Sequence, residues 1–219
     1  FDLGRAEEKG VLTVFVSLWR LGSQNCTRDK KERNTKMEIN GQTVSPQAEY
    51  RQLGLSDELM RAIDKKGYVQ ATPVQAGAIP FFMDWKDVIA KAPTGTGKTM
   101  AFGLPIIERM DRESEAVQAL ILAPTRELAI QITQELREVA GRLSDHMKRR
   151  TVTVKEVQTV VLDEADRMLD MGFIHDVTRI LDKIPNRKNL GMFSATISRE
   201  VMDISWVYQR DPEEITVQA

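Results

Sequence analysis

The segment from Asp87 to Thr99 constrains the fold of this chain more than any other part of the sequence. It begins with the apolar run Val-Ile-Ala, continues through the closely spaced Gly95 and Gly97, and ends on Lys98 and a threonine. The glycines allow the backbone to bend so that successive N–H groups point at one anion. A helix that begins near Lys98 adds the positive end of its dipole. The segment therefore predicts a strand, a phosphate-binding loop and the first turn of a helix.

The residue types in this loop indicate a nucleoside triphosphate. Lys98 supplies a mobile positive charge for the β and γ phosphates, and Thr99 supplies a hydroxyl ligand for Mg²⁺. The general pattern begins with glycine, whereas this chain has Ala92 at that position. An ordinary turn between strand and helix is the alternative, but Lys-Thr directly after the second glycine favours the nucleotide. The candidate loop residues are Thr94, Gly95, Thr96, Gly97, Lys98 and Thr99.

Size and composition limit the remaining possibilities. The chain has 219 residues, enough for one α/β domain, and its 42% hydrophobic and 29% charged residues are ordinary for a globular protein. The formal net charge is −1, so nucleic acid would have to bind at a local site and not through a global basic field. Cys26 is the only cysteine, which excludes an intramolecular disulfide and favours a reducing, cytoplasmic compartment.

The N-terminal residues 1–36 differ in character from the rest of the chain. They combine an apolar run, Val11–Trp19, with the charged run Arg28–Arg33. The apolar run is too short to span a bilayer, so no membrane association is predicted. We expect residues 1–36 to form a solvated or poorly ordered extension with no assigned role, and residues 37–219 to form the domain.

From residue 55 onward, apolar stripes with helical spacing alternate with short apolar runs that are typical of buried strands. Helices are predicted to begin after the capping residues Ser56, Thr72, Thr125 and Ser198, after the phosphate-binding loop, and at Phe173. Strands are predicted at residues 118–123, 157–162, 191–193 and 214–217. This alternation predicts an α/β fold, a parallel sheet with helices on both faces. In such sheets ligands bind at the carboxyl ends of the strands.

Two carboxylates follow a predicted buried strand. Mg²⁺ prefers one or two carboxylates together with phosphate oxygens and water. Asp163 comes directly after Val-Val-Leu, where a phosphate-loop site carries its metal-positioning aspartate. Glu164 would then lie beside the metal, where it can accept a proton from an attacking water. The alternative is an acidic helix start without a metal, since the helix dipole alone favours acidic residues there.

Five motifs occur in a fixed order along the chain. They are Gly67–Gln75, Ala92–Thr99, Pro124–Ala129, Asp163–Asp166 and Ser194–Thr196. In this order they resemble the first RecA-like domain of DEAD-box RNA helicases. The resemblance covers about Tyr50 to Ala219 and accounts for Ala92, since these helicases carry alanine at that position.

The resemblance implies ATP and Mg²⁺ as ligands. Gln75 would read the adenine, helped by Thr72, with Tyr68 in the same motif and Tyr50 stacking on the base. The family usually carries phenylalanine at the position of Tyr50 and proline at that of Ala71. For the phosphates and the metal, the resemblance implies roles for Lys98, Thr99, Asp163 and, as activator of the attacking water, Glu164.

The resemblance also implies an RNA partner, single-stranded or duplex. Contacts to the sugar-phosphate backbone carry no sequence information, so binding would be sequence-nonspecific. Ser194 and Thr196 would couple the nucleotide state to strand separation. The residues expected to contact RNA are Pro124, Thr125, Arg126, Gly141 and Arg142.

Two departures limit what the resemblance implies. The segment between Ala129 and Asp163 is too short for the two further strands that the family places there, and we infer that about forty residues have been lost. We therefore expect an incomplete P-loop NTPase sheet with exposed edges and apolar faces, and with much of the RNA track lost. We also expect the second RecA-like domain, which would supply arginines for ATP hydrolysis, to be absent from this chain.

Three functions remain open from the sequence. The first is the ATP-binding domain of an ATP-dependent RNA helicase, a hydrolase that couples Mg-ATP binding and hydrolysis to RNA binding and duplex unwinding. The second is a truncated, non-catalytic fragment that binds nucleotide or RNA with little activity alone. The third is another phosphate-loop ATPase, which Gln75 together with the Asp163–Asp166 motif disfavours.

Overall fold

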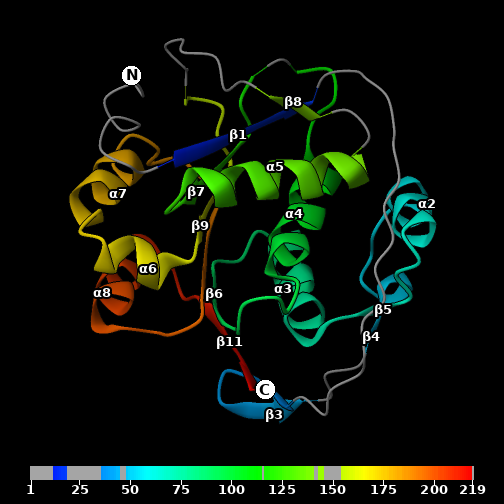
Figure 1. The fold of residues 1–219 in the computed structure, drawn as a ribbon, viewed down its shortest axis with the longest axis horizontal. Helices are drawn as coiled ribbons and strands as arrows, with labels where there is room; N and C mark the ends of the chain where they lie inside the picture. The colour runs from blue at the N-terminus through cyan, green and yellow to red at the C-terminus, as the bar shows by residue number, and fades with distance from the viewer. Residues whose placement is uncertain are drawn as a thin grey trace.

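The computed structural model describes residues 12–18, 36–44, 48–114, 116–140, 143–145 and 154–218. Their main feature is a nine-stranded sheet with the order β3-β2-β11-β6-β10-β9-β7-β1-β8. Strands β11, β6, β10, β9 and β7 run parallel to one another and form its centre. Helices cover this sheet, α6, α7 and α8 lying apart from α3, α4 and α5 (Figure 1). The predicted parallel sheet with helices on both faces is confirmed.

The strands are short, and the helices begin near the predicted positions. The sheet strands are β1 (Leu12–Leu18), β2 (Lys36–Ile39), β3 (Gln42–Val44), β6 (Val88–Lys91), β7 (Ala119–Ala123), β8 (Leu143–Asp145), β9 (Thr159–Asp163), β10 (Asn189–Ser194) and β11 (Glu213–Gln218). The helices are η1 (Tyr50–Gln52), α2 (Asp57–Lys65), α3 (Pro73–Met83), α4 (Lys98–Arg109), α5 (Arg126–Ala140), α6 (Ala165–Asp170), α7 (Ile174–Leu181) and α8 (Arg199–Tyr208).

Alternate residues of the central strands face two separate hydrophobic clusters. In β7, Ile121 packs in the cluster that includes α3, α4 and α5, whereas Leu120 and Leu122 pack in the cluster with α6, α7 and α8. In β9, Val161 belongs to the first cluster, and Val160 belongs to the second. A strand buried on both faces needs apolar residues at every position, which explains the unbroken apolar runs in the sequence.

The predicted helix starts are confirmed after all four capping residues. The hydroxyl oxygens of Ser56 and Ser198 accept the N–H groups of Leu59 and Val201, each at 3.4 Å. The hydroxyl oxygen of Thr125 accepts the N–H of Leu128 at 3.3 Å. At the fourth start, α3 begins directly after its N-cap Thr72, and the side-chain oxygen of Gln75 accepts the N–H of Thr72 at 2.9 Å. Each cap satisfies an N–H group that the helix itself leaves unpaired.

The edge of the sheet beside β7 differs from the prediction. Strand β1, within residues 1–36, pairs antiparallel with β7 from Leu12↔Ala123 to Val16↔Ala119, and then with β8 (Figure 1). A solvated extension does not account for this strand, and the outer edge of β7 is not left open. The prediction failed because pairing of segments about a hundred residues apart depends on tertiary structure and leaves no local pattern.

A second, two-stranded sheet lies at the start of the domain. Strand β4 (Ala48–Glu49) pairs antiparallel with β5 (Gln70–Ala71). This pair brings Tyr50, the first residue of η1, next to the start of α3.

In the described parts of the chain, no helix is both long enough and apolar enough to cross a membrane.

Candidate nucleotide and metal site

Three of the motifs meet at the carboxyl edge of the parallel sheet. Strand β10 lies between β6 and β9, with Ser194 opposite Lys91 and Phe193 opposite Asp163. The N–H of Ala92, the first residue after β6, donates to the carbonyl of Ser194 at 2.9 Å. The phosphate-binding loop, Asp163 and Ser194 therefore lie at adjacent strand ends, as the parallel sheet predicts.

The loop after β6 has the backbone shape that the sequence predicts. Gly95 and Gly97 have φ angles of 80° and 87°, in the left-handed region that glycine adopts at little cost. Thr96 holds the turn by donating its hydroxyl to the carbonyl of Pro93 at 2.7 Å. Thr94 at the tip is exposed. The bend directs the chain into α4, which begins at Lys98.

Lys98 turns its charge toward the loop and the neighbouring strands. Its side chain is 7% exposed, and Nζ donates to the carbonyl of Ala92 at 3.0 Å. Burial of an ammonium group costs free energy unless the group is paired or hydrogen-bonded. Thr99 follows in the first turn of α4 and is half-buried. Lys98 is thus placed to contact a phosphate in the loop, and Thr99 is placed to contact a cation bound to that phosphate.

Asp163 is almost completely buried at the end of β9. Burial raises the pKa of this carboxyl to about 6, although the positive charge of Lys98 acts in the opposite direction. One of its oxygens accepts the N–H of Glu164 at 3.0 Å. A divalent cation would favour the ionised carboxylate, because its positive charge compensates for the hydration that the carboxylate loses on burial. This environment fits a metal-positioning aspartate.

Glu164 turns the chain from β9 into α6 with a positive φ of 50°, which is uncommon for a residue with a side chain. Its carboxylate is partly buried and lies 3.4 Å from Arg167. Strained backbone of this kind costs of order 1–3 kcal/mol and often marks a functional site. The side chain therefore stands beside Asp163 at a position that the fold holds at a cost.

Asp166 connects two of the motifs, a contact that the sequence analysis did not assign. Its carboxylate accepts both the N–H and the hydroxyl of Thr196, at 2.9 Å and 2.7 Å. Its own N–H donates to the hydroxyl oxygen of Ser194 at 3.0 Å. Burial alone would raise the pKa of Asp166, but the hydrogen bonds from Thr196 and its other partners lower it. Asp166 belongs to the quoted Asp163–Asp166 motif, which was the signal available for finding it.

Gln75 and its neighbours lie against the other side of the phosphate-binding loop. Its Nε2 donates to the carbonyl of Gly97 at 3.0 Å, and its Oε1 accepts the N–H of Thr72 at 2.9 Å. Tyr50 is buried, and its hydroxyl donates to the same Oε1 at 2.5 Å. Stacking of the Tyr50 ring on a base stays a prediction, since the ring is 3% exposed. Tyr68 is 40% exposed.

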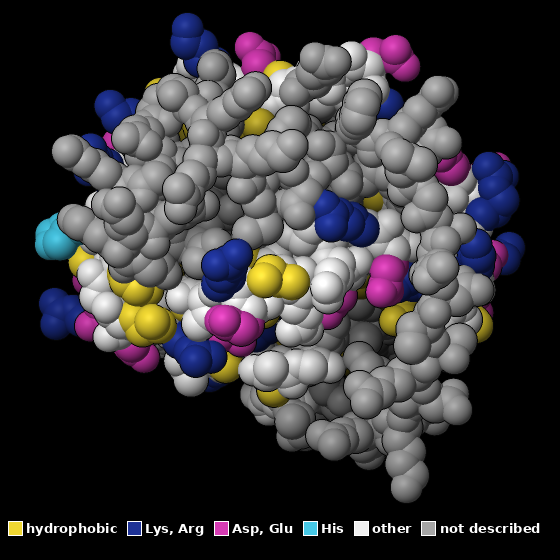
Figure 2. All heavy atoms as spheres, turned by 45° about the horizontal axis from the view of Figure 1, so that its top comes forward, with side chains coloured by type: hydrophobic (Ala, Val, Ile, Leu, Met, Phe, Trp, Pro, Cys, Tyr) yellow, Lys and Arg dark blue, Asp and Glu magenta, His cyan; other side chains and the backbone are white. Residues whose placement is uncertain are grey.

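The remaining predicted residues lie along the same edge or outside the described part. Pro124 and Thr125 follow β7, and Arg126 is exposed at the start of α5. Gly141 and Arg142 lie outside the described residues. On the face in Figure 2, basic and acidic side chains are interspersed over the described atoms. Binding of RNA along this edge stays a prediction.

The residues present fit a nucleotide with Mg²⁺. The hydroxyl oxygen of Thr72 is buried without a hydrogen-bond partner, so a base donor or acceptor would satisfy it. Among the described residues no three His, Cys, Asp or Glu side chains cluster as a metal site. The candidate metal ligands are the carboxylate of Asp163 and the hydroxyl of Thr99. Two protein ligands suit Mg²⁺, because this ion keeps water and phosphate oxygens as further ligands.

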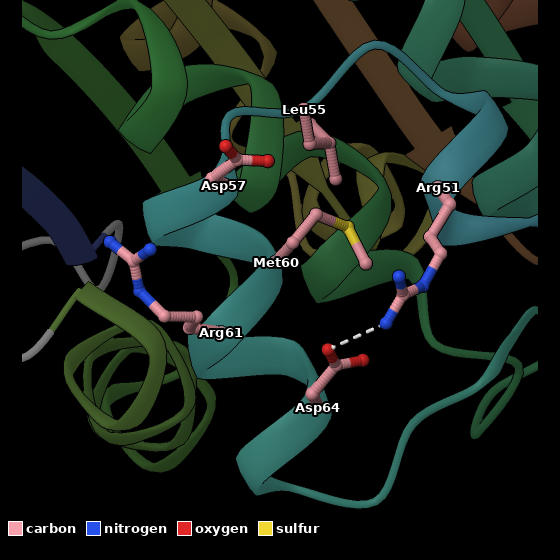
Figure 3. A pocket seen from close by; sticks show the side chains of 6 residues that line it. All are labelled: Arg51, Leu55, Asp57, Met60, Arg61 and Asp64. Carbon is pink, nitrogen blue, oxygen red and sulfur yellow. Dashed lines mark hydrogen bonds and ion pairs between the residues drawn. The ribbon is translucent and has the colours of Figure 1, made fainter.

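A surface hollow of about 410 Å³ lies elsewhere, over α2 and η1 (Figure 3). Its ion pair, Arg51–Asp64 at 3.1 Å, joins two exposed side chains and contributes little to stability. None of the predicted site residues lines it. The hollow is lined by Arg51, Leu55, Asp57, Met60, Arg61 and Asp64. We place the candidate site at the sheet edge and not in this hollow.

Comparison with known proteins identifies similar sequences. The family pattern described as DEAD/DEAH box helicase matches residues 72–142 and 138–204. The chain is 41% identical to "ATP-dependent RNA helicase CshA" of Limosilactobacillus reuteri, and the match covers 78% of this chain and 41% of the relative. It is 40% identical to the "DEAD-box ATP-dependent RNA helicase CshA" of Geobacillus kaustophilus, with 78% and 44% covered. The chain thus spans about two fifths of the length of these relatives.

Two solved structures are also similar. A DEAD box protein from the hyperthermophile Methanococcus jannaschii superposes with a TM-score of 0.70 at 33% identity, covering 78% of this chain and 56% of that one. A hypothetical ATP-dependent RNA helicase from Sulfolobus tokodaii gives 0.64 at 29% identity, with 74% and 57% covered. The predicted RecA-like fold is confirmed by these likenesses.

Proposed function

Because this chain belongs to the DEAD/DEAH box helicase family, we propose that it binds Mg-ATP at the sheet edge and couples its hydrolysis to RNA binding and duplex unwinding. The observation that carries the proposal is the convergence of Lys98, Asp163 and Ser194 at three adjacent strand ends. The relatives named above are ATP-dependent RNA helicases. Their whole-chain activity is proposed here for the protein to which this domain belongs.

The chemistry of the site follows from the positions of its charged groups. Lys98 exchanges its hydrogen bond with the Ala92 carbonyl for one with a phosphate oxygen, and the glycine turn presents backbone N–H groups to the same anion. Thr99 and Asp163 would hold Mg²⁺, which neutralises charge on the phosphates when bound. Glu164 lies beside them and accepts a proton from the attacking water.

Coupling to RNA is proposed to pass through Asp166. Its carboxylate holds Thr196, and its N–H contacts Ser194, whose carbonyl accepts the N–H of Ala92 from the phosphate-binding loop. A shift of the loop on nucleotide binding would therefore be felt at Ser194 and Thr196. Pro124, Thr125 and Arg126 at the end of β7 would contact the RNA backbone, which carries no sequence information.

Full activity requires more than the residues of this chain. A second RecA-like domain is expected to supply arginines to the transferring phosphoryl group, and such arginines raise kcat by roughly 10³–10⁵. We therefore expect the isolated chain to bind ATP weakly and hydrolyse it slowly.

The test compares ATP hydrolysis, with and without single-stranded RNA, in the chain, two site variants and two control variants. We expect Lys98→Ala and Glu164→Gln each to lower the slow rate at least tenfold, because each removes a group that acts on the phosphates or the attacking water. Lys65→Ala and Glu113→Gln are matched controls, since both side chains are exposed away from the site. Equal rates in all five proteins would contradict hydrolysis at this site.

A non-catalytic binding fragment is the second candidate. The relative from Limosilactobacillus reuteri matches over 204 positions, yet 78% of the 219 residues is about 171, so about 33 of its positions have no counterpart here. The family pattern also matches in two pieces that overlap at residues 138–142. Both observations support the loss of a segment after α5. Nucleotide binding without measurable hydrolysis by the unmodified chain would favour this candidate.

A further inference from the structure

The amide of Gln75 has little capacity left for a ligand. An amide oxygen has two lone pairs, and the N–H of Thr72 and the hydroxyl of Tyr50 occupy both at 2.9 Å and 2.5 Å. The amide nitrogen has two N–H groups, one of which donates to the carbonyl of Gly97 at 3.0 Å. Gln75 therefore keeps a single N–H for recognition and no free acceptor.

The orientation of this amide is fixed by the backbone. The N–H of Thr72 can only donate and the carbonyl of Gly97 can only accept, so oxygen and nitrogen cannot exchange places. A β-carbon placed on Gly97 would lie 2.5 Å from Nε2, which shows how closely the amide packs on the turn. Because Oε1 faces Tyr50, the tyrosine hydroxyl must donate its proton to it.

Base selectivity depends on the acceptor that Tyr50 occupies. Adenine presents N7 as an acceptor and its 6-amino group as a donor, and a glutamine reads this pair with one N–H and its oxygen. Guanine presents two acceptors, N7 and O6, so a free glutamine oxygen repels it. When the oxygen is already saturated, the amino group of adenine gains a hydrogen bond only by displacing another, and the distinction between the two bases weakens.

We propose that the hydroxyl of Tyr50 sets the base selectivity of this site, by holding the oxygen of Gln75 and so reducing the preference for ATP over GTP. The proposal rests on the proposed function, since it requires a purine nucleotide beside Gln75. Tyr50 acts on base selectivity as a positioning residue, because its hydroxyl works through the amide oxygen of Gln75. A phenylalanine at this position would keep the buried ring and leave one lone pair free for the adenine amino group.

The test measures binding of Mg-ATP and Mg-GTP to the whole chain by isothermal titration calorimetry. In Tyr50→Phe we expect the ratio of the GTP and ATP dissociation constants to rise about five- to tenfold, the value of one net hydrogen bond. In a Gln75→Ala background, Tyr50→Phe should leave the ratio unchanged, because the oxygen that the hydroxyl controls is absent. Tyr208→Phe is the matched control, since it removes a hydroxyl of α8 that donates to Asp182 at the end of α7.

The outcomes separate the two proposals. If both nucleotides bind and Tyr50→Phe leaves their ratio unchanged, the role of Tyr50 is overturned and the nucleotide site stands. An equal rise of the ratio in the Gln75→Ala background would also overturn it, because the effect would not pass through the amide. If neither nucleotide binds at millimolar concentration, the nucleotide site itself is contradicted, and the inference with it. Thermal unfolding of each variant checks that the fold is retained.

Discussion

The burial of Asp163 is the residue-scale feature that is most informative about the candidate site. Its carboxyl group is removed from water, and its partners in the described structure are one N–H and the charge of Lys98. An aspartate is seldom buried without a cation or several donors. This environment supports the proposed cation site, because an aspartate with a purely structural role gains more from full hydrogen bonding.

The raised pKa of Asp163 predicts a dependence of stability on pH in the absence of Mg²⁺. The pKa is about 6 in the folded chain, against an ordinary value of 3.8, so the folded state retains a proton that the unfolded state has lost. The free energy of unfolding should therefore fall by about 3 kcal/mol as pH rises from about 4 to about 6, and then level off. Urea unfolding at pH 4–8 measures this change.

Asp163→Asn provides the comparison, since an amide does not titrate. The variant should lack the part of the pH dependence that belongs to this group, while other carboxylates contribute equally to both proteins. Parallel stability curves for the two proteins between pH 4 and pH 6 would contradict the prediction.

At the scale of elements, the crossing of α3 and β10 illustrates a constraint that the sequence pattern does not show. Phe82 of α3 and Phe193 of β10 have ring centroids 5.9 Å apart, and Phe102 of α4 lies 5.1 Å from Phe193. Gly191 lies under the first ring, because a β-carbon there would be 2.3 Å from the tip of Phe82. The glycine permits the close approach of helix and strand.

Gly191→Ala should therefore destabilise the chain by roughly 1–3 kcal/mol through overpacking of the core. The double variant Gly191→Ala with Phe82→Leu should recover part of this loss relative to the sum of the two single changes, because the shorter side chain makes room for the methyl group. Urea unfolding of the four proteins gives the interaction energy. Strict additivity would contradict the contact as the cause.

At the scale of the whole molecule, the open question is what completes the sheet beside β7. The central strands carry the motifs, and β7 ends the parallel series. In this structure the antiparallel strand β1 pairs with β7 over five residue pairs. An unpaired edge of this kind is a template for association with other chains. Strand β1 thus covers the edge of β7, which would otherwise be unpaired because the segment after α5 is too short to supply the further strands.

Removal of residues 1–19 should expose the edge of β7 and cause self-association. We expect the truncated chain to form oligomers or aggregates, as measured by light scattering during size-exclusion chromatography, at concentrations where the whole chain remains monomeric. A full-length variant with Val14→Pro and Val16→Pro should behave like the truncation, since proline cannot donate to a strand ladder. A monomeric truncated chain with an unchanged thermal transition would contradict the role of β1.

Local sequence determined much of this protein. The glycines and the lysine of the loop after β6, the unbroken apolar runs of the central strands and the caps at Ser56 and Ser198 are constraints between close neighbours, and the structure confirms them. Helix α6 and the short strands β2 to β5 were not predicted, because segments of two to six residues are too short for a periodic pattern.

Only the tertiary structure decided the contacts between distant segments. The sequence contains Tyr50, Asp166 and residues 12–18, but nothing near them along the chain indicates that they meet Gln75, Thr196 and β7. The pKa of Asp163 likewise depends on burial by several elements at once. Sequence periodicity and turn chemistry act over a few residues and so fix the phosphate-binding loop. The fold brings remote groups within hydrogen-bond distance and so decides which partners each of them finds.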